Sequence, residues 1–147
     1  MKSKGLMWVV FLLGAINQAL AAPSYTDNGD ETVTDNNTGL IWQKSDDDVQ
    51  RNWQQALDYC NGLSLGGKTD WRLPNIKELL SVVDLSTYDP AIDTTNFPGV
   101  LAGVSNSYYW SSSYYSPNPV HAWYVTFYTG GSNYTNKTSN YYVRCVY

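Results

Sequence analysis

Few side chains of this 147-residue chain are of the types that perform catalysis or hold a metal. His121 is the single histidine, and its neighbours Pro119, Val120 and Ala122 offer neither an acid nor a nucleophile. Metal sites need several clustered ligands, and nucleophilic catalysis needs a serine or cysteine beside a base. We therefore expect a protein that is not an enzyme, with no catalytic residues, no metal site and no cofactor.

Cys60 and Cys145 are the only cysteines, and two chemistries are open to them. In an oxidising compartment such a pair normally forms a disulfide. A bridge between residues so far apart in the sequence would stabilise the fold by about 4 to 5 kcal/mol in the chain-entropy model. The alternative is two free thiols, one of them catalytic. Because the N-terminus carries an export signal, described below, we predict the disulfide.

Two acid-rich stretches raise the question of calcium. Residues 27–30 lack the EF-hand spacing, which places a glutamate at the twelfth position, so this stretch is predicted to form a turn. The three consecutive carboxylates at 46–48 would point in different directions in a strand or loop, and they predict a solvated segment. The Glu-Pro-Asn, Gln-Pro-Asp and Trp-Asn-Asp signatures of calcium-dependent sugar binding are absent from the sequence.

Residues 106–142 are unusually rich in tyrosine, asparagine and serine, in a chain with 13 tyrosines and only 3 phenylalanines. Tyrosine offers rigid amphipathic contact area, while asparagine and serine supply adaptable hydrogen bonds, as in antibody paratopes. The alternative is a tyrosine-rich sheet whose rings fill gaps in the core. We predict ligand contact for the residues expected in turns or on outward strand positions, namely Tyr114, Tyr115, Asn118, Tyr128, Ser132, Asn133, Tyr134, Asn136, Asn140 and Tyr141.

The charge of the chain excludes one class of partner. The net charge is -4 and the isoelectric point about 4.7, and no cluster of lysine or arginine occurs after position 4. Proteins that bind nucleic acid present a basic patch to the phosphates. No nucleic-acid partner is expected.

The first residues have the pattern of a secretory signal peptide. Lys2 and Lys4 precede an apolar run at 5–16, and the small residues Ala19 and Ala21 stand where a signal peptidase reads the chain. A retained membrane anchor is the alternative, but the run is shorter than the roughly 20 residues that cross a bilayer. We predict a signal peptide over 1–21, one domain over 22–147, export, and no membrane insertion.

Two helices are indicated by caps and apolar spacing. A capping box at Asn52 and Gln55 opens the first, and one at Asn75 and Glu78 opens the second. Apolar residues at helical spacing then form one inward face on each helix. These residues are Trp53, Ala56, Leu57 and Cys60 in the first helix, and Ile76, Leu79, Leu80 and Val83 in the second.

The rest of the domain has the texture of strands and loops. Turn residues at 27–29 and 35–39 separate short apolar runs and predict a β-hairpin over 25–43. Alternation predicts a strand over 123–128, turned by 129–131, and a last strand over 143–147 that carries Cys145. Proline, glycine, aspartate and asparagine at 88–103 predict a long irregular loop anchored by Ile92, Phe97 and Val100.

Seven strings, in order along the chain, resemble the Lcl C-terminal domain family. They are TDNGD at 26–30, TVTD at 32–35, TGLIWQ at 38–43, DWRLP at 70–74, YWSS at 109–112, AWYV at 122–125 and YVRCV at 142–146. The resemblance implies an exported bacterial module with an α+β, C-type lectin-like fold: two short helices, a small antiparallel sheet and a long irregular loop region. It also implies framework roles for the residues in or beside these strings, Tyr109, Trp110, Trp123, Val125, Phe127 and Val143.

Some C-type lectin-like proteins are targets of diversity-generating retroelements, and the asparagine and tyrosine of 128–141 resemble their output. We therefore expect a binding module in the periplasm, on the cell surface or outside a bacterium that contacts a protein or glycan partner on another cell or envelope. A diversified receptor is the more specific form of this expectation. The alternative is a structural or assembly subunit whose aromatic surface packs against identical copies or an envelope partner. The sequence does not indicate an oligomeric state.

Overall fold

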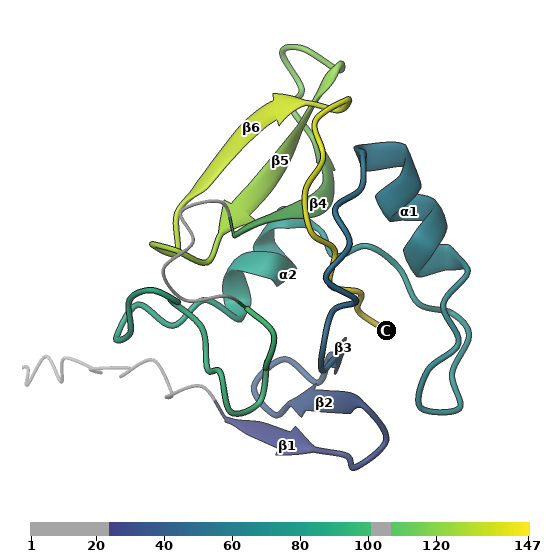
Figure 1. Cartoon of the computed structure of the whole chain (residues 1–147), viewed down its shortest axis with the longest axis vertical. Helices are drawn as coiled ribbons and strands as arrows, with labels where there is room; N and C mark the ends of the chain where they lie inside the picture. The colour runs from purple at the N-terminus through teal and green to yellow at the C-terminus, as the bar shows by residue number, and fades with distance from the viewer. Residues whose placement is uncertain (1–23, 101–106) are drawn as a thin grey trace, which may run out of the picture.

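The computed structural model describes residues 24–100 and 107–147, and these form two small sheets and two short helices (Figure 1). The predicted signal peptide and the end of the predicted loop, residues 101–103, lie outside the described residues. The α+β architecture with two short helices is confirmed. It differs from the prediction in one respect, because there are two three-stranded sheets where one was expected.

The first sheet extends the predicted hairpin by one strand. Strands β1 (Tyr25–Asp27), β2 (Thr32–Asp35) and β3 (Ile41–Gln43) pair antiparallel in that order. The second turn is held by the Asp35 carboxylate, which accepts hydrogen bonds from the backbone N–H of Asn37 and the hydroxyl of Thr38. The carboxylate thus closes an Asx turn, the role that favours aspartate at such positions.

Both helices begin where their capping boxes predict. Helix α1 (Trp53–Asn61) is capped by Asn52, and helix α2 (Ile76–Ser81) by Asn75, with both reciprocal hydrogen bonds present in each box. Helix α2 is shorter than its apolar pattern, because Val82 already ends it. Local signals therefore fix where the helices begin, and the packing around them decides how far they continue.

The second sheet is made of β4 (Tyr108–Tyr114), β5 (His121–Thr126) and β6 (Ser132–Asn136), again antiparallel and in chain order. The predicted strand over 123–128 is therefore shifted toward the N-terminus, and its last two residues belong to the turn. Strands β4 and β6 were not predicted individually. Their polar serines and asparagines hide the alternation that marks a half-buried strand.

The prediction of a last strand over 143–147 is wrong. The segment makes only isolated bridges, in which Val146 pairs with both Trp42 and Arg72. Arg144 and Val146 are fully buried, as Val143 and Cys145 are, so burial does not alternate. The segment runs between the two sheets and α1 (Figure 1), where partners surround it and both of its sides are covered.

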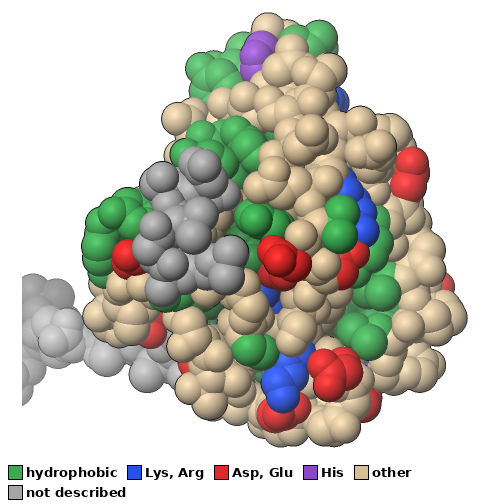
Figure 2. All heavy atoms as spheres, viewed as in Figure 1, with side chains coloured by type: hydrophobic (Ala, Val, Ile, Leu, Met, Phe, Trp, Pro, Cys, Tyr) green, Lys and Arg blue, Asp and Glu red, His purple; other side chains and the backbone are tan. Residues whose placement is uncertain are grey.

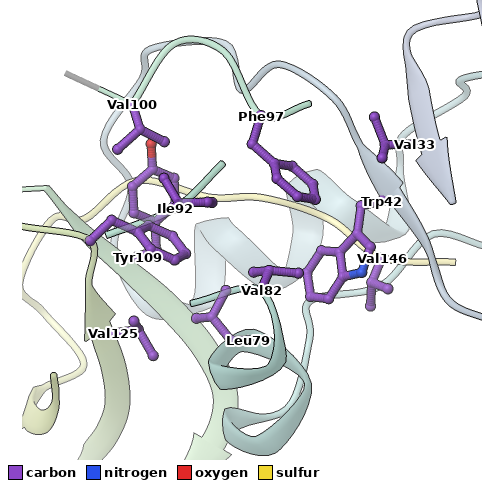
Figure 3. Close-up of a cluster of buried hydrophobic side chains, with 11 residues drawn as sticks. Val33, Trp42, Leu79, Val82, Ile92, Phe97, Val100, Tyr109, Val125 and Val146 are labelled. Atoms are coloured by element: carbon purple, nitrogen blue, oxygen red, sulfur yellow. The ribbon is translucent and has the colours of Figure 1, made fainter. Parts of the chain in front are cut away.

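Two hydrophobic clusters form the core. The first joins the first sheet, α2, the loop at 88–100 and the base of the second sheet (Figure 3), and includes Trp42, Leu79, Phe97 and Val125. The three predicted loop anchors, Ile92, Phe97 and Val100, all lie in it. The second cluster packs α1 against β4 and the C-terminal segment, through residues including Ala56, Trp71, Trp110 and Val143.

The predicted disulfide between Cys60 and Cys145 is confirmed, and the chain has no free cysteine. It joins the end of α1 to the C-terminal segment inside the second cluster. This leaves the alternative of two free thiols without support. No helix in the described part of the chain is long and apolar enough to span a membrane.

Candidate functional site

The residues that could have done catalysis or bound metal are dispersed. His121 begins β5, and Asp46, Asp47 and Asp48 lie between β3 and α1. Within residues 24–100 and 107–147, no group of three or more histidine, cysteine, aspartate or glutamate side chains is arranged to hold a metal ion.

The run at 46–48 is not the uniformly solvated segment that we predicted. The Asp46 side chain is only 4% exposed, because its Oδ2 lies 3.3 Å from Arg144 Nη2 and accepts the Tyr109 hydroxyl at 2.5 Å. Arg144 also donates to the carbonyls of Gln43 and Lys44. Burial raises the pKa of the Tyr109 phenol far above its usual value, so that this group remains a donor. Asp46 is therefore a structural residue of the core.

The predicted ligand contacts do not form one surface. The second sheet has two faces, and the register decides which face each side chain takes. Trp123 pairs with Tyr134 and His121 with Asn136, which places these four side chains together on one face. Tyr124 pairs with Asn133 on the other face. The set therefore divides into separate groups.

The first group is a cluster of rings at the end of the second sheet, which we call the aromatic platform and define as Tyr115, His121, Trp123 and Tyr134. Tyr115 and Tyr134 stack with ring centroids 3.8 Å apart and an interplanar angle of 6°. Trp123 meets both rings edge-on at 5.8 and 5.5 Å, and His121 meets Tyr134 edge-on at 5.9 Å. Each ring thus holds its neighbours in place.

The platform and a part of the core share one face of the second sheet, but the platform lies outside the region that the core residues cover. Val125, two residues along β5 from Trp123, is fully buried in the first cluster, whereas Tyr134 is 40% exposed. Figure 2 shows hydrophobic side chains next to the histidine at the top of the molecule. The rings at the platform are therefore not needed to exclude water from the core.

The hairpin tip beside the platform is fixed by its own backbone. The N–H of Tyr115 donates to the carbonyl of His121 at 2.9 Å, and those of Asn118 and His121 close the tip with two further bonds of 3.0 Å. Hydrogen bonding to Tyr134 raises the pKa of the Tyr115 phenol. Asn118 is exposed at the tip and Asn136 is exposed on β6. Both amides flank the rings, and both belong to the predicted set.

Tyr114 faces the opposite side, toward α1. It is 57% exposed, and the ammonium group of Lys137 lies 5.7 Å from its ring and 3.9 Å from that of Trp53. The backbone N–H of Trp53 also donates to the Lys137 carbonyl at 3.0 Å. Tyr114 therefore covers a lysine that ties β6 to the start of α1.

Tyr128 and Ser132 lie at the far end of the sheet. Tyr128 follows β5 and packs against Tyr88, with ring centroids 5.1 Å apart, next to the loop at 88–100. Ser132 opens β6 opposite Val125. The length of β5 separates both residues from the hairpin tip.

Asn133, Asn140 and Tyr141 belong to the other face of the sheet or to its edge. Tyr141 packs against Tyr108 and Tyr124 at 5.0 and 4.9 Å, and these two rings are 5.0 Å from each other. A hollow of about 180 Å³ opens beside them, lined by Gln50, Tyr108, Asn140 and Tyr141. We call it the tyrosine cleft.

Sequence reasoning missed several of these residues. His121 was considered only as a catalytic candidate and Trp123 only as framework, yet both line the platform. Gln50 and Tyr108 come from stretches that the sequence does not connect to residues 140–141. The bridge between Arg51 and Tyr141 brings them together. The alternation of His121, Trp123 and Val125 was the available signal, because it assigns all three to one face.

Another hollow, of about 740 Å³, lies elsewhere, between the first sheet and α2. Tyr25, Leu80, Val83 and Leu85 give it an apolar floor, and Asp35 and Asp84 are at its rim. Burial, followed by the charge of Asp35, raises the pKa of the Tyr25 phenol far above its usual value. Both carboxylates are occupied in their own turns, Asp35 by Thr38 and Asp84 by Ser86.

Comparison with known families gives a match over most of the chain. The model of the Lcl C-terminal domain matches residues 31–147, which is nearly the whole of the described structure. The curated proteins contain no match to the chain. Both helices and every strand except β1 lie inside the matched range.

Proposed function

We propose that this chain, which belongs to the Lcl C-terminal domain family, is an exported, non-catalytic binding module whose aromatic platform contacts a protein or a glycan on a cell surface or envelope. The observation that carries the proposal is the position of the platform. Its four rings form one connected cluster at the open end of the second sheet, outside both core clusters. Tyr134 is exposed and the other three rings are partly exposed, and accessible aromatic surface of this kind marks interaction sites.

The platform is built for binding without rearrangement. Stacked and edge-on contacts already restrict the ring torsions, and the hairpin tip is closed by three backbone hydrogen bonds. A ligand that docks there pays little for ordering side chains, which is the advantage of a preorganised site. Asn118 and Asn136 offer the N–H donors of their carboxamides to a polar ligand, while their oxygens already accept hydrogen bonds from Val120 and Thr138.

Export and the absence of catalysis are parts of the proposal. Export is supported by the disulfide, since disulfides persist in oxidising compartments and are rare in the cytosol. A non-catalytic role is supported by the chemistry of the described residues: both cysteines are bonded to each other, and the carboxylate of Asp46 is committed to Arg144. The surface around the aromatic platform is rich in aromatic rings, amides and hydroxyls.

The test uses purified 22–147 against a printed array of glycans and against intact bacterial and epithelial cells. We expect the wild-type protein to bind at least one of these probes and the Tyr115→Ala/Tyr134→Ala variant to bind it at least about 30-fold more weakly, as for aromatic hot spots. The matched control is Tyr88→Ala, which removes a more exposed tyrosine, 64% against 40% for Tyr134, from a ring pair far from the hairpin tip and leaves binding unchanged.

Two outcomes would contradict the proposal. One is equal binding by the wild-type protein and the Tyr115→Ala/Tyr134→Ala variant. The other is a concentration-dependent oligomer, measured by sedimentation, that the Tyr115→Ala/Tyr134→Ala variant no longer forms. That result would assign the platform to assembly with identical copies, because a self-complementary patch buries the same rings on both partners.

A diversified receptor is the finer form of this proposal, and it makes a prediction about natural variation. Ser132, Asn133, Tyr134 and Asn136 are all exposed on β6, so substitutions there leave the core intact. Sequencing the gene across a population of the source organism should find variation at these codons and none at Cys145, which is fully buried. Uniform codons at 132–136 would remove diversification from the proposal and leave a binder of fixed specificity.

A further inference from the structure

The tyrosine cleft is separate from the aromatic platform and is assembled from three distant stretches of the chain. Gln50 precedes α1, Tyr108 begins β4, and Asn140 and Tyr141 follow β6. Backbone hydrogen bonds lock the stretches together. Arg51 and Tyr141 exchange two bonds of 2.8 and 2.9 Å, and the N–H of Tyr142 donates to the Tyr108 carbonyl at 2.9 Å. The walls are therefore fixed before any ligand arrives.

The phenol rings of Tyr108 and Tyr141 form the floor of the cleft, and Tyr124 packs against both of them. The centroids of Tyr108, Tyr124 and Tyr141 are 4.9 to 5.0 Å from one another, and Tyr141 also packs on the buried Trp110 at 4.7 Å. Burial raises the pKa of the Tyr124 and Tyr141 phenols, so both remain neutral hydroxyls in the physiological range. The floor thus presents ring faces and uncharged polar edges.

The rim of the cleft carries polar groups that are not in use. Gln50 and Asn140 are exposed, and no other described residue gives their carboxamides a hydrogen bond, nor one to the Tyr108 hydroxyl. Each of these groups can both donate and accept. They converge on a hollow of about 180 Å³, smaller than the sites that hold drug-sized ligands and of a size for a single ring.

No ionised side chain lines the cleft. The nearest cation in sequence, Arg51, is paired with Asp47 and lies over the Tyr59 ring at 3.9 Å. A ligand with a sulfate, phosphate or carboxylate would find no counter-charge here, in a protein that is itself acidic. The cleft offers ring faces beside neutral donor and acceptor groups. A compact ligand with C–H faces and several hydroxyls would complement them.

We propose that the tyrosine cleft binds one neutral sugar ring, without a metal ion, at a site independent of the aromatic platform. The ring lies with its C–H face on Tyr108 and Tyr141, where the negative ring faces attract it, and its hydroxyls bond the carboxamides of Gln50 and Asn140. A ligand of this size reaches affinities of about 1 mM.

The experiment is saturation-transfer NMR of purified 22–147 with the methyl glycosides of glucose, galactose and mannose, together with N-acetylglucosamine and the anionic sugar glucuronate. We expect at least one neutral sugar to bind, with the dissociation constant raised at least about tenfold in Gln50→Ala/Asn140→Ala and several-fold in Tyr108→Phe, which keeps the ring. Gln50 and Asn140 are exposed, and Tyr108→Phe keeps the ring that packs on Tyr124 and Tyr141, so both variants retain the fold. Asn61→Ala, which removes an exposed amide at the end of α1, is the matched control and has no effect.

Three results would overturn the proposal: no neutral sugar bound at up to about 50 mM, tighter binding of glucuronate, or equal binding by Gln50→Ala/Asn140→Ala and the wild type. A sugar signal that survives Gln50→Ala/Asn140→Ala but is lost in Tyr115→Ala/Tyr134→Ala would also overturn it, while supporting the platform as the binding site. Different variants therefore test the proposal for the cleft and the proposal for the platform, so the failure of one is distinguished from the failure of the other.

Discussion

Replacing Cys60 and Cys145 with alanine should lower the free energy of unfolding by about 4 to 5 kcal/mol, the largest effect expected of any change in this domain. The disulfide closes a loop with a sequence separation of 85, which includes the last two residues of α1, all of α2 and the whole second sheet. Opening it restores the conformational freedom of that loop to the unfolded chain. A domain of this size has about 5 to 15 kcal/mol in total, so the variant would be close to unfolding.

Urea unfolding followed by tryptophan fluorescence measures this effect. Wild-type protein reduced with dithiothreitol is the control for packing, because it keeps both sulfur atoms in the second core cluster while losing the bond. We expect the reduced protein and the Cys60→Ala/Cys145→Ala variant to unfold at similarly low urea. A reduced protein as stable as the oxidised one would show that packing of the C-terminal segment, rather than the covalent bond, holds the domain together.

The second large effect is expected at Asp46. Asp46→Ala leaves the fully buried guanidinium of Arg144 with only the carbonyls of Gln43 and Lys44, and takes away the acceptor of the Tyr109 hydroxyl. Breaking a buried ion pair from one side costs about 3 to 5 kcal/mol, because the remaining charge is uncompensated. The same measurement of urea unfolding applies. Asp47→Ala is the matched control, since its ion pair with Arg51 is partly exposed and contributes less than about 1 kcal/mol.

A double-mutant cycle separates the ion pair from the packing around it. Arg144→Met should be as damaging as Asp46→Ala, whereas Asp46→Ala/Arg144→Met should cost clearly less than the two single losses together. Purely additive losses would contradict the account of Asp46 and Arg144 as a coupled pair. The network matters for the binding surface as well, because Tyr109 belongs to β4 and pairs with Val125 at the base of the platform's sheet face.

The helices could be predicted from sequence because their signals are local. The Asn52 and Asn75 caps form their hydrogen bonds with residues at most three positions away. The C-terminal segment could not be predicted in this way. Val146 pairs with Trp42 and with Arg72, contacts that only the finished fold brings together, so both sides of the segment are buried and no alternation survives.

The candidate site shows the same division between local and distant information. Composition located the tyrosines and asparagines of the second sheet, but it does not say on which face of the sheet each side chain lies. Tyr114 and Tyr115 are adjacent in sequence, yet one contacts Lys137 on the α1 side and the other stacks on Tyr134. Alternation along a strand separates neighbours in this way, and pairing register then decides their partners. The prediction that Asp46 is solvated was wrong for another reason: its partner Arg144 is 98 residues away in the sequence.

We infer that the aromatic platform serves binding and not folding. Two measurements on one preparation of Tyr115→Ala/Tyr134→Ala test this inference: its binding to cells or to the glycan array, and its free energy of unfolding. We expect binding to be lost while the free energy of unfolding falls by only about 1 to 2 kcal/mol, the contribution of a partly exposed ring pair. Loss of folding in proportion to loss of binding, or binding that survives without these rings, would contradict it.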